Sequence, residues 1–169
     1  ITVLGITVIL PMVLMAALAP VLFTDDPTFV NTSVRLLPPS SEHWFGTDFL
    51  GRDAYSRVIF GSRISLFVGF STAGVTMVLA VFIGLLTGYF RRVDLVVMRV
   101  MDGLMAMPTI LLAIAMMATL GGSVQNVIIA LCVSQVPRAT RVVRSSVLSL
   151  REEQYVDAAR AIGASARRI

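Results

Sequence analysis

The sequence has no lysine, one cysteine, one histidine and few charged residues of any kind. With Cys132 and His43 each alone, neither an intrachain disulfide nor a zinc site is expected, and no metal ligand is assigned. The patterns G-x-S-x-G and H-E-x-x-H are absent, as is the phosphate-binding G-x-x-x-x-G-K-[ST]. The sequence therefore predicts no catalytic residues, and an intramembrane enzyme is a weak alternative.

The sequence is rich in hydrophobic residues. They make up 56% of the 169 residues, and only 14% of the residues are charged, whereas about a quarter of the residues in soluble domains are charged. The net charge of +4 comes entirely from arginine, but no basic helix is free to bind nucleic acid. This composition is that of an integral membrane protein, and membrane lipid is the expected surrounding.

The long apolar runs predict four membrane spans. The expected elements are a first span at 1–23, an external loop at 24–61, spans at 62–90, 94–120 and 123–144, and a charged segment at 145–169. The first run is longer than the ~7–15 apolar residues of a secretory signal and lacks a convincing cleavage site, so we expect a retained span. Because the chain starts at Ile1, we expect its cytoplasmic start to be missing.

Arginine asymmetry predicts the topology. The short loop at 90–94 and the segment at 138–169 carry an excess of arginine, whereas the charges of loop 24–61 nearly balance. Positive loops stay in the cytoplasm, so 90–94 and 138–169 are expected inside and 24–61 outside.

Small residues recur every four positions along the second span, at Ala80, Gly84 and Gly88. Such a stripe lets another helix approach closely, and these three residues are the expected helix-packing site. The alternative is that glycine is simply common in membrane helices.

Charged residues within the third and fourth spans have two interpretations each. Arg99 and Asp102 lie three apart on one helix face, which favours a structural ion pair over a proton relay. Pro108 is expected to loosen the same helix. Arg138, Arg141 and Arg144 repeat every three residues, which could suit a voltage sensor, but a stripe that binds lipid phosphates is favoured.

A polar segment precedes the second span and reads His43-Trp44-Phe45-Gly46-Thr47-Asp48-Phe49-Leu50-Gly51-Arg52-Asp53. It resembles the H-x-x-G-T-D-x-x-G-R-D segment of the C-type permease of dipeptide, oligopeptide and nickel importers. Glycines allow backbone turns, and Thr and Asp cap them. The segment is either an external gate or docking surface, or a structural elbow that starts the helix. Its motif residues are Gly46, Thr47, Asp48, Gly51, Arg52 and Asp53.

The final segment carries Asp157-Ala158-Ala159, three residues and then Gly163. It resembles the E-A-A-x-x-x-G cytoplasmic loop of importers powered by an ATP-binding cassette (ABC importers), with Asp in place of Glu. The resemblance implies that a short helix seats in a groove of the ATPase. The implied ATPase-coupling residues are Asp157, Ala158, Ala159, Arg160 and Gly163.

The two resemblances together imply a permease subunit of a type I ABC importer of the peptide and nickel group. The implied fold is all-α and integral to the membrane, a polytopic helical bundle of the MetI-like type. Family members have six spans, so the last two are expected to be missing here. The subunit would not be an enzyme and would bind no cofactor itself, because ATP and Mg²⁺ bind to the partner subunits.

The resemblance also implies partners and a location. The expected partners are a second permease subunit, two ATP-binding subunits and an extracytoplasmic substrate-binding protein, in the inner membrane of a bacterial or archaeal cell. Peptides are the expected substrate, with nickel or another small solute as the alternative. A different class, an ion-coupled secondary transporter, would need paired acidic or histidine residues at mid-membrane, and the sequence offers only Asp102.

Overall fold

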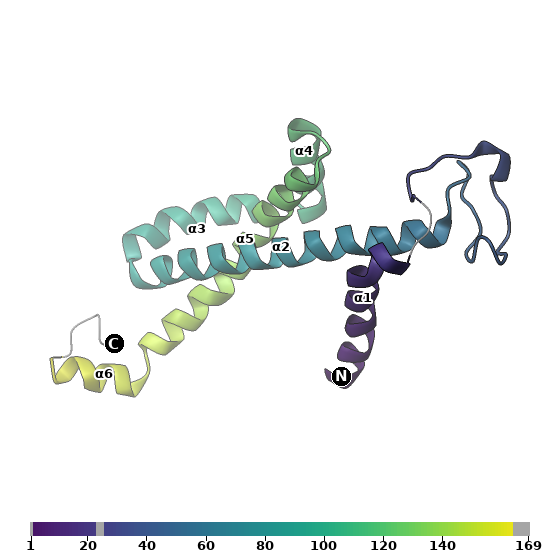
Figure 1. The fold of residues 1–169 in the computed structure, drawn as a ribbon. Coiled ribbons are helices and arrows are strands. Elements are labelled where there is room, and N and C mark those ends of the chain that lie inside the picture. The colour runs from purple at the N-terminus through teal and green to yellow at the C-terminus, as the bar shows by residue number, and fades with distance from the viewer. Residues whose placement is uncertain (1, 23–25, 164–169) are drawn as a thin grey trace. The chain divides into compact units, whose positions relative to one another are not determined.

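The computed structural model describes residues 2–22 and 26–163, and it is helical over most of that length. The elements in chain order are α1 (Thr2–Leu22), the 3₁₀ helix η1 (Thr32–Val34), α2 (Ala54–Tyr89), α3 (Arg91–Met105), α4 (Thr109–Leu120), α5 (Val124–Arg151) and α6 (Gln154–Ala161) (Figure 1). Within the described residues the only strand-like pairing is an isolated bridge between Thr47 and Asp53. The all-α prediction is confirmed.

The helix bounds differ from the expected ones in three places. α2 begins at Ala54, inside the segment expected to be a loop, because Asp53 caps it there. α5 runs on to Arg151, beyond the expected end of the fourth span at residue 144. The most marked difference is in the expected third span, where α3 and α4 are separate helices bent by 89°.

Proline causes this bend. Pro108 lacks an N–H and disfavours helical backbone at the residue before it, so the chain leaves the helix after Met105 and a new one starts at Thr109. Pro108 therefore breaks the helix, where the sequence predicted only a loosening. Pro137 lies inside α5 without ending it.

Among the residues that the structure describes, α2 is the one helix that qualifies as a membrane span by length and apolar composition, and the bent pair α3–α4 adds a second if it is counted as one span. The apolar part of α1 described at Gly5–Ala19 is shorter than a span needs. The count of four spans thus stays a prediction. Large apolar side chains such as Phe70, Met77 and Phe82 are exposed on α2, as on a helix that faces lipid.

The chain divides into two compact units, residues 1–69 and 70–169. The first holds α1, η1, the polar loop and the start of α2. In the second, α5 is the central helix, because α3, α4 and α6 all contact it. Small side chains of α5, including Ala130, Ser134 and Thr140, are buried.

Candidate functional site

Two glycines set the backbone of the loop motif. Gly46 and Gly51 have φ of +71° and +73°, a region that side chains other than glycine's rarely enter. A Cβ at Gly46 would overlap the carbonyl oxygen of Leu37, and one at Gly51 would overlap that of Asn31. Both positions therefore require glycine for conformation and for space.

Thr47 and Asp48 stabilise the loop through hydrogen bonds to its backbone and to Arg52. The Thr47 hydroxyl accepts a hydrogen bond from Leu37 N at 2.9 Å and donates one to Val34 O. The Asp48 carboxylate accepts from Leu50 N at 2.8 Å, Arg52 N at 3.0 Å and Arg52 Nε at 2.9 Å. Partial burial raises the pKa of Asp48, but these hydrogen bonds and the Arg52 charge outweigh it and lower the pKa to about 2.

Asp53 fixes the start of α2. One carboxylate oxygen accepts from the Ser56 backbone N–H at 2.7 Å and from its hydroxyl at 2.6 Å, as an N-cap residue does. The other oxygen lies 3.1 Å from His43 Nδ1. Arg57 adds a second cation to Asp48 at 2.5 Å. The motif's polar groups are thus bonded to one another and to the adjacent backbone, which fixes the start of α2; whether the segment is an elbow or a docking surface stays a prediction.

In the second unit, Gly84 and Gly88 of α2 lie against α5. A Cβ on Gly84 would come within 2.7 Å of Val143 Cβ, and one on Gly88 within 2.6 Å of Val147 Cγ1. Ala80, one turn earlier, is 1% exposed. The partner of this small-residue face is thus another helix of the same chain.

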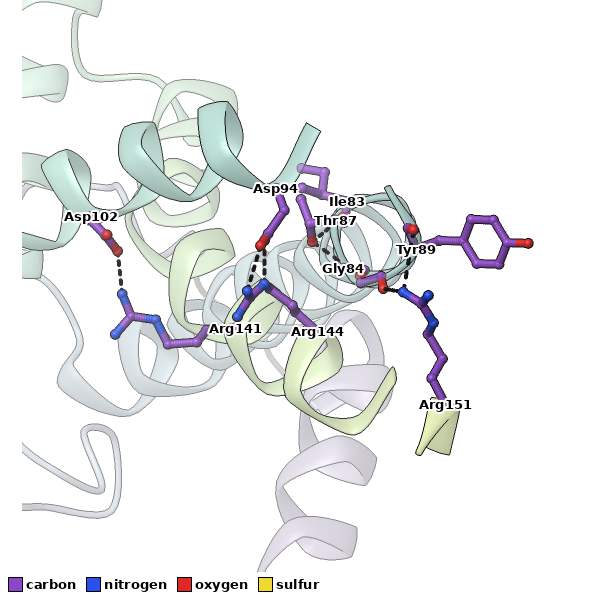
Figure 2. A network of polar contacts seen from close by, with 10 residues as sticks. Ile83, Gly84, Thr87, Tyr89, Asp94, Asp102, Arg141, Arg144 and Arg151 are labelled. Atoms are coloured by element: carbon purple, nitrogen blue, oxygen red, sulfur yellow. Dashed lines mark hydrogen bonds and ion pairs between the residues drawn. The ribbon is translucent and has the colours of Figure 1, made fainter. Parts of the chain in front are cut away.

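Two ion pairs join α3 to α5 (Figure 2). Arg144 donates through Nε and Nη2 to the two oxygens of Asp94, the second bond at 2.6 Å. Arg141 Nη2 lies 2.5 Å from Asp102 Oδ1. The expected pair between Arg99 and Asp102 is therefore wrong, because Arg141 takes the carboxylate.

The expectation that Arg138, Arg141 and Arg144 all bind lipid phosphates is wrong for two of the three. Arg141 and Arg144 are paired with acids of α3, and of these three arginines Arg138 is the one without an ion pair in the described residues. Local spacing missed this because the partners are 39 and 50 residues away in sequence. A usable signal was present, since Asp94 and Asp102 are eight residues apart and so recur on one face after about two turns.

Arg151 joins the end of α5 to the end of α2. Its Nη1 donates to the carbonyl oxygens of Gly88 at 2.6 Å and Tyr89 at 3.4 Å, which lie in the last turn of α2 (Figure 2). These carbonyls have no partner within the helix, and a cation there also opposes the negative end of the helix dipole. The guanidinium carbon lies 5.4 Å from the centroid of the Tyr89 ring.

Of the expected coupling segment at 145–169, residues 145–151 belong to α5 and Gln154–Ala161 form α6, while residues 164–169 lie outside the described residues. Val156 is buried, whereas Ala158 is exposed, and Gly163 has a φ of +80° with nothing within 4 Å of a Cβ built on it. Asp157, Ala159 and Arg160 lie in the helix, but their side chains fall outside the described residues, as do Arg167 and Arg168. α6 is thus a short helix with small residues, and it follows the end of α5, which Arg151 joins to the end of α2.

The sequence also matches a protein-family model. Residues 76–169 match the family described as binding-protein-dependent transport system inner membrane component. The chain belongs to this family. The match covers the part of α2 from Thr76 and all of α3 to α6, which includes both ion pairs and the segment expected to contact the ATPase.

Individual members of the family are similar over almost the whole chain. A putative peptide transport system permease protein of Brucella suis is 47% identical over 165 residues, which are 98% of this chain and 56% of that protein. A dipeptide transport system permease protein of Alkalihalophilus pseudofirmus is 44% identical over 98% of this chain and 55% of its own length. A probable D,D-dipeptide transport system permease protein of Escherichia coli is 38% identical over 97% and 55%. The chain thus spans about half the length of these relatives.

Proposed function

We propose that this chain forms the membrane part of a permease subunit in an ATP-driven, binding-protein-dependent importer, and that the substrates are peptides. The observation that carries the proposal is the 47% identity to a peptide transport system permease over 98% of the chain. The proposed partners are a second permease subunit, two ATP-binding subunits and an extracytoplasmic binding protein. ATP and Mg²⁺ would bind to the ATP-binding subunits, which supply the energy.

The second unit has a geometry suited to coupling. α6 follows α5 after two residues. Arg144 and Arg141 of α5 form ion pairs with α3, and Arg151 of α5 donates hydrogen bonds to the end of α2. A displacement of α6 by an ATPase would therefore move the ends of three helices together. Such rigid-body movement is the ordinary means by which a change at one site opens or closes another.

Exposure of α6 supports a partner surface. Ala158 is exposed, so its small side chain is accessible to a partner. In the proposed complex, a groove of the ATPase covers this residue and Gly163. We place α6 in the cytoplasm and the loop motif outside, following the arginine asymmetry.

The test compares variants that differ in what they disturb. Ala158→Leu adds bulk on an exposed surface, so it leaves this chain intact but overpacks a groove that holds α6. Overpacking costs about 1–3 kcal/mol, or roughly a ten- to hundredfold loss of ATPase association. Ala17→Leu, the same change at an exposed position of α1, is the matched control.

Gly163 needs a second comparison, because its positive φ makes Gly163→Leu strained even without a partner. Gly163→Asn tolerates this backbone better and still adds a side chain. The measurements are co-purification of the ATP-binding subunits and peptide uptake into vesicles. Normal co-purification and uptake with both Ala158→Leu and Gly163→Asn would show that α6 is not the coupling helix.

An ion-coupled secondary transporter gains no support from the structure. Its only candidate proton carrier, Asp102, is ion-paired with Arg141 and 61% exposed.

A further inference from the structure

The second unit contains a polar hollow between three helices. Its volume is about 330 Å³, and its lining comes from α2, the first residue of α4, and α5. The lining residues are Thr76, Thr109, Ser134, Gln135, Arg138 and Ala139. Five of these six side chains carry a polar or charged group, so the hollow suits a polar occupant.

Arg138 is the charged residue of this hollow. It is exposed and has no ion pair in the described residues, whereas Arg141 and Arg144 on the same helix are both paired. It also lines a second hollow of about 600 Å³ with Met105, Arg141, Val142 and Ser145. Neither hollow is lined by an Asp or Glu among the described residues, so the guanidinium is free to bind an external anion.

Thr76 supplies a second, independent sign of a ligand. Its hydroxyl oxygen is buried and makes no hydrogen bond in the described part of the chain. Helical threonines and serines usually bond back to a carbonyl of the preceding turn, as Thr87 and Ser134 do here. A buried hydroxyl without a partner costs about 1–3 kcal/mol, which a bound polar group would recover.

The start of α4 adds backbone donors. Thr109 is the first residue of α4 and lines the hollow, and the N-cap Pro108 offers no side chain to the first N–H groups. Those groups have no partner within a helix and carry the positive end of its dipole. Arg138, Thr76 and the first residue of α4 thus line one space.

From this convergence we infer that the hollow is an anion subsite in which Arg138, Thr76 and the N-terminus of α4 hold the C-terminal carboxylate of a peptide as it crosses the permease. A carboxylate matches the fork of a guanidinium and accepts from the hydroxyl and the backbone amides as well. The anion subsite stands on the geometry alone, whereas the assignment of a peptide rests on the proposed function.

The test probes charge in the hollow chemically. In the full importer complex, Gln135→Cys is introduced into a background with Cys132→Ala and no other reactive cysteine. Its labelling rates with an anionic sulfonate thiosulfonate and a cationic trimethylammonium thiosulfonate are compared. A unit positive charge about 6 Å away attracts the anionic reagent and repels the cationic one, each by roughly threefold, so it favours the anionic over the cationic reagent by roughly tenfold even at the dielectric constant of water. Ala139→Cys serves as a second reporter position.

Arg138→Gln should abolish this preference, Arg138→Lys should retain it, and Arg99→Gln, an arginine outside the hollow, is the matched control. Dialanine should slow the labelling, whereas dialanine amide at the same concentration should not. An anionic preference that persists in Arg138→Gln, or equal protection by the acid and the amide, would overturn the inference. Protection by inorganic phosphate but not by dialanine would also overturn it, since the subsite would then hold a phosphate such as a lipid headgroup.

A measurement of dialanine uptake distinguishes failure of this inference from failure of the proposed function. Radiolabelled dialanine uptake is measured in the same vesicles, and Arg138→Gln should reduce it roughly tenfold or more, the effect expected for a lost hydrogen bond to a charged group. If the wild-type complex takes up no peptide, the proposed function fails, while the anionic preference at Gln135→Cys still decides whether the anion subsite exists.

Discussion

The contact between α2 and α5 predicts opposite effects for two alanine substitutions in one helix. A Cβ at Gly84 would lie 2.7 Å from both Cβ and Cγ1 of Val143, and 3.2 Å from Arg144 N. Carbon atoms prefer about 3.5–4.0 Å, so roughly 1 Å of helix displacement is needed. At Gly74, three turns earlier on α2, a Cβ would meet nothing within 4 Å.

The magnitudes follow from these distances. Replacing a helical glycine by alanine stabilises by about 0.5–1 kcal/mol where space is available, so Gly74→Ala should be neutral or stabilising. At Gly84 the same gain is opposed by an overpacking cost of about 1–3 kcal/mol. Gly84→Ala should therefore be less stable than Gly74→Ala by about 1–3 kcal/mol, and Gly84→Leu less stable still.

Cys132 provides the assay. It is 5% exposed, so a thiol-reactive dye labels it only when the second unit opens. The midpoint of labelling on heating, with Cys132→Ser as the blank, reports the stability of the α2–α5 contact. Adding Val143→Ala to Gly84→Ala should recover part of the loss, because it removes Cγ1. Equal midpoints for Gly84→Ala and Gly74→Ala would refute the close packing of these helices.

Two further predictions concern charged groups. The pKa of Asp48, about 2 against an ordinary 3.8, means that its stabilising effect is full above pH 3.8 and lost as the pH falls toward 2. The ring of Trp44 lies 5.0 Å from that of Tyr55, centroid to centroid, so Trp44 fluorescence should report this loss of loop structure. Asp48→Asn should remove most of the fluorescence change between pH 3.8 and pH 2. The same pH titration in Asp48→Asn as in the wild type would contradict the role of Asp48. Arg144→Gln leaves Asp94 half-buried without its partner and should destabilise the second unit by about 1–3 kcal/mol, more than the double change with Asp94→Asn. The Cys132 assay measures this difference, and a double variant no better than the single one would show that the pair is dispensable.

Composition and local motifs predicted the class of fold well. Long apolar runs with few charges required helices, and Gly46 and Gly51 indicated the turns that the structure places at positive φ. The proline at position 108 also marked the correct point of distortion, although its effect was underestimated. All of these features depend on residues within a few positions of one another.

The arginines of α5 show where sequence reasoning failed. Their spacing revealed a common helix face, but the choice between lipid and Asp94 or Asp102 depends on how α3 folds back along α5. That arrangement follows from the break at Pro108 and from packing, neither of which a local pattern encodes. The hollow beside Arg138 escaped notice for the same reason, since its polar residues come from three separate helices.

The pairing of Asp94 with Arg144 also has a consequence for biosynthesis. The two residues are 50 positions apart, so at about 5–20 residues per second the ribosome adds Arg144 roughly 3 to 10 seconds after Asp94. During that interval Arg144 is not yet available to Asp94, so the contact through both carboxylate oxygens cannot form. The ion pair that joins α3 to α5 therefore belongs to a late step of folding, after the chain has been synthesised beyond residue 144.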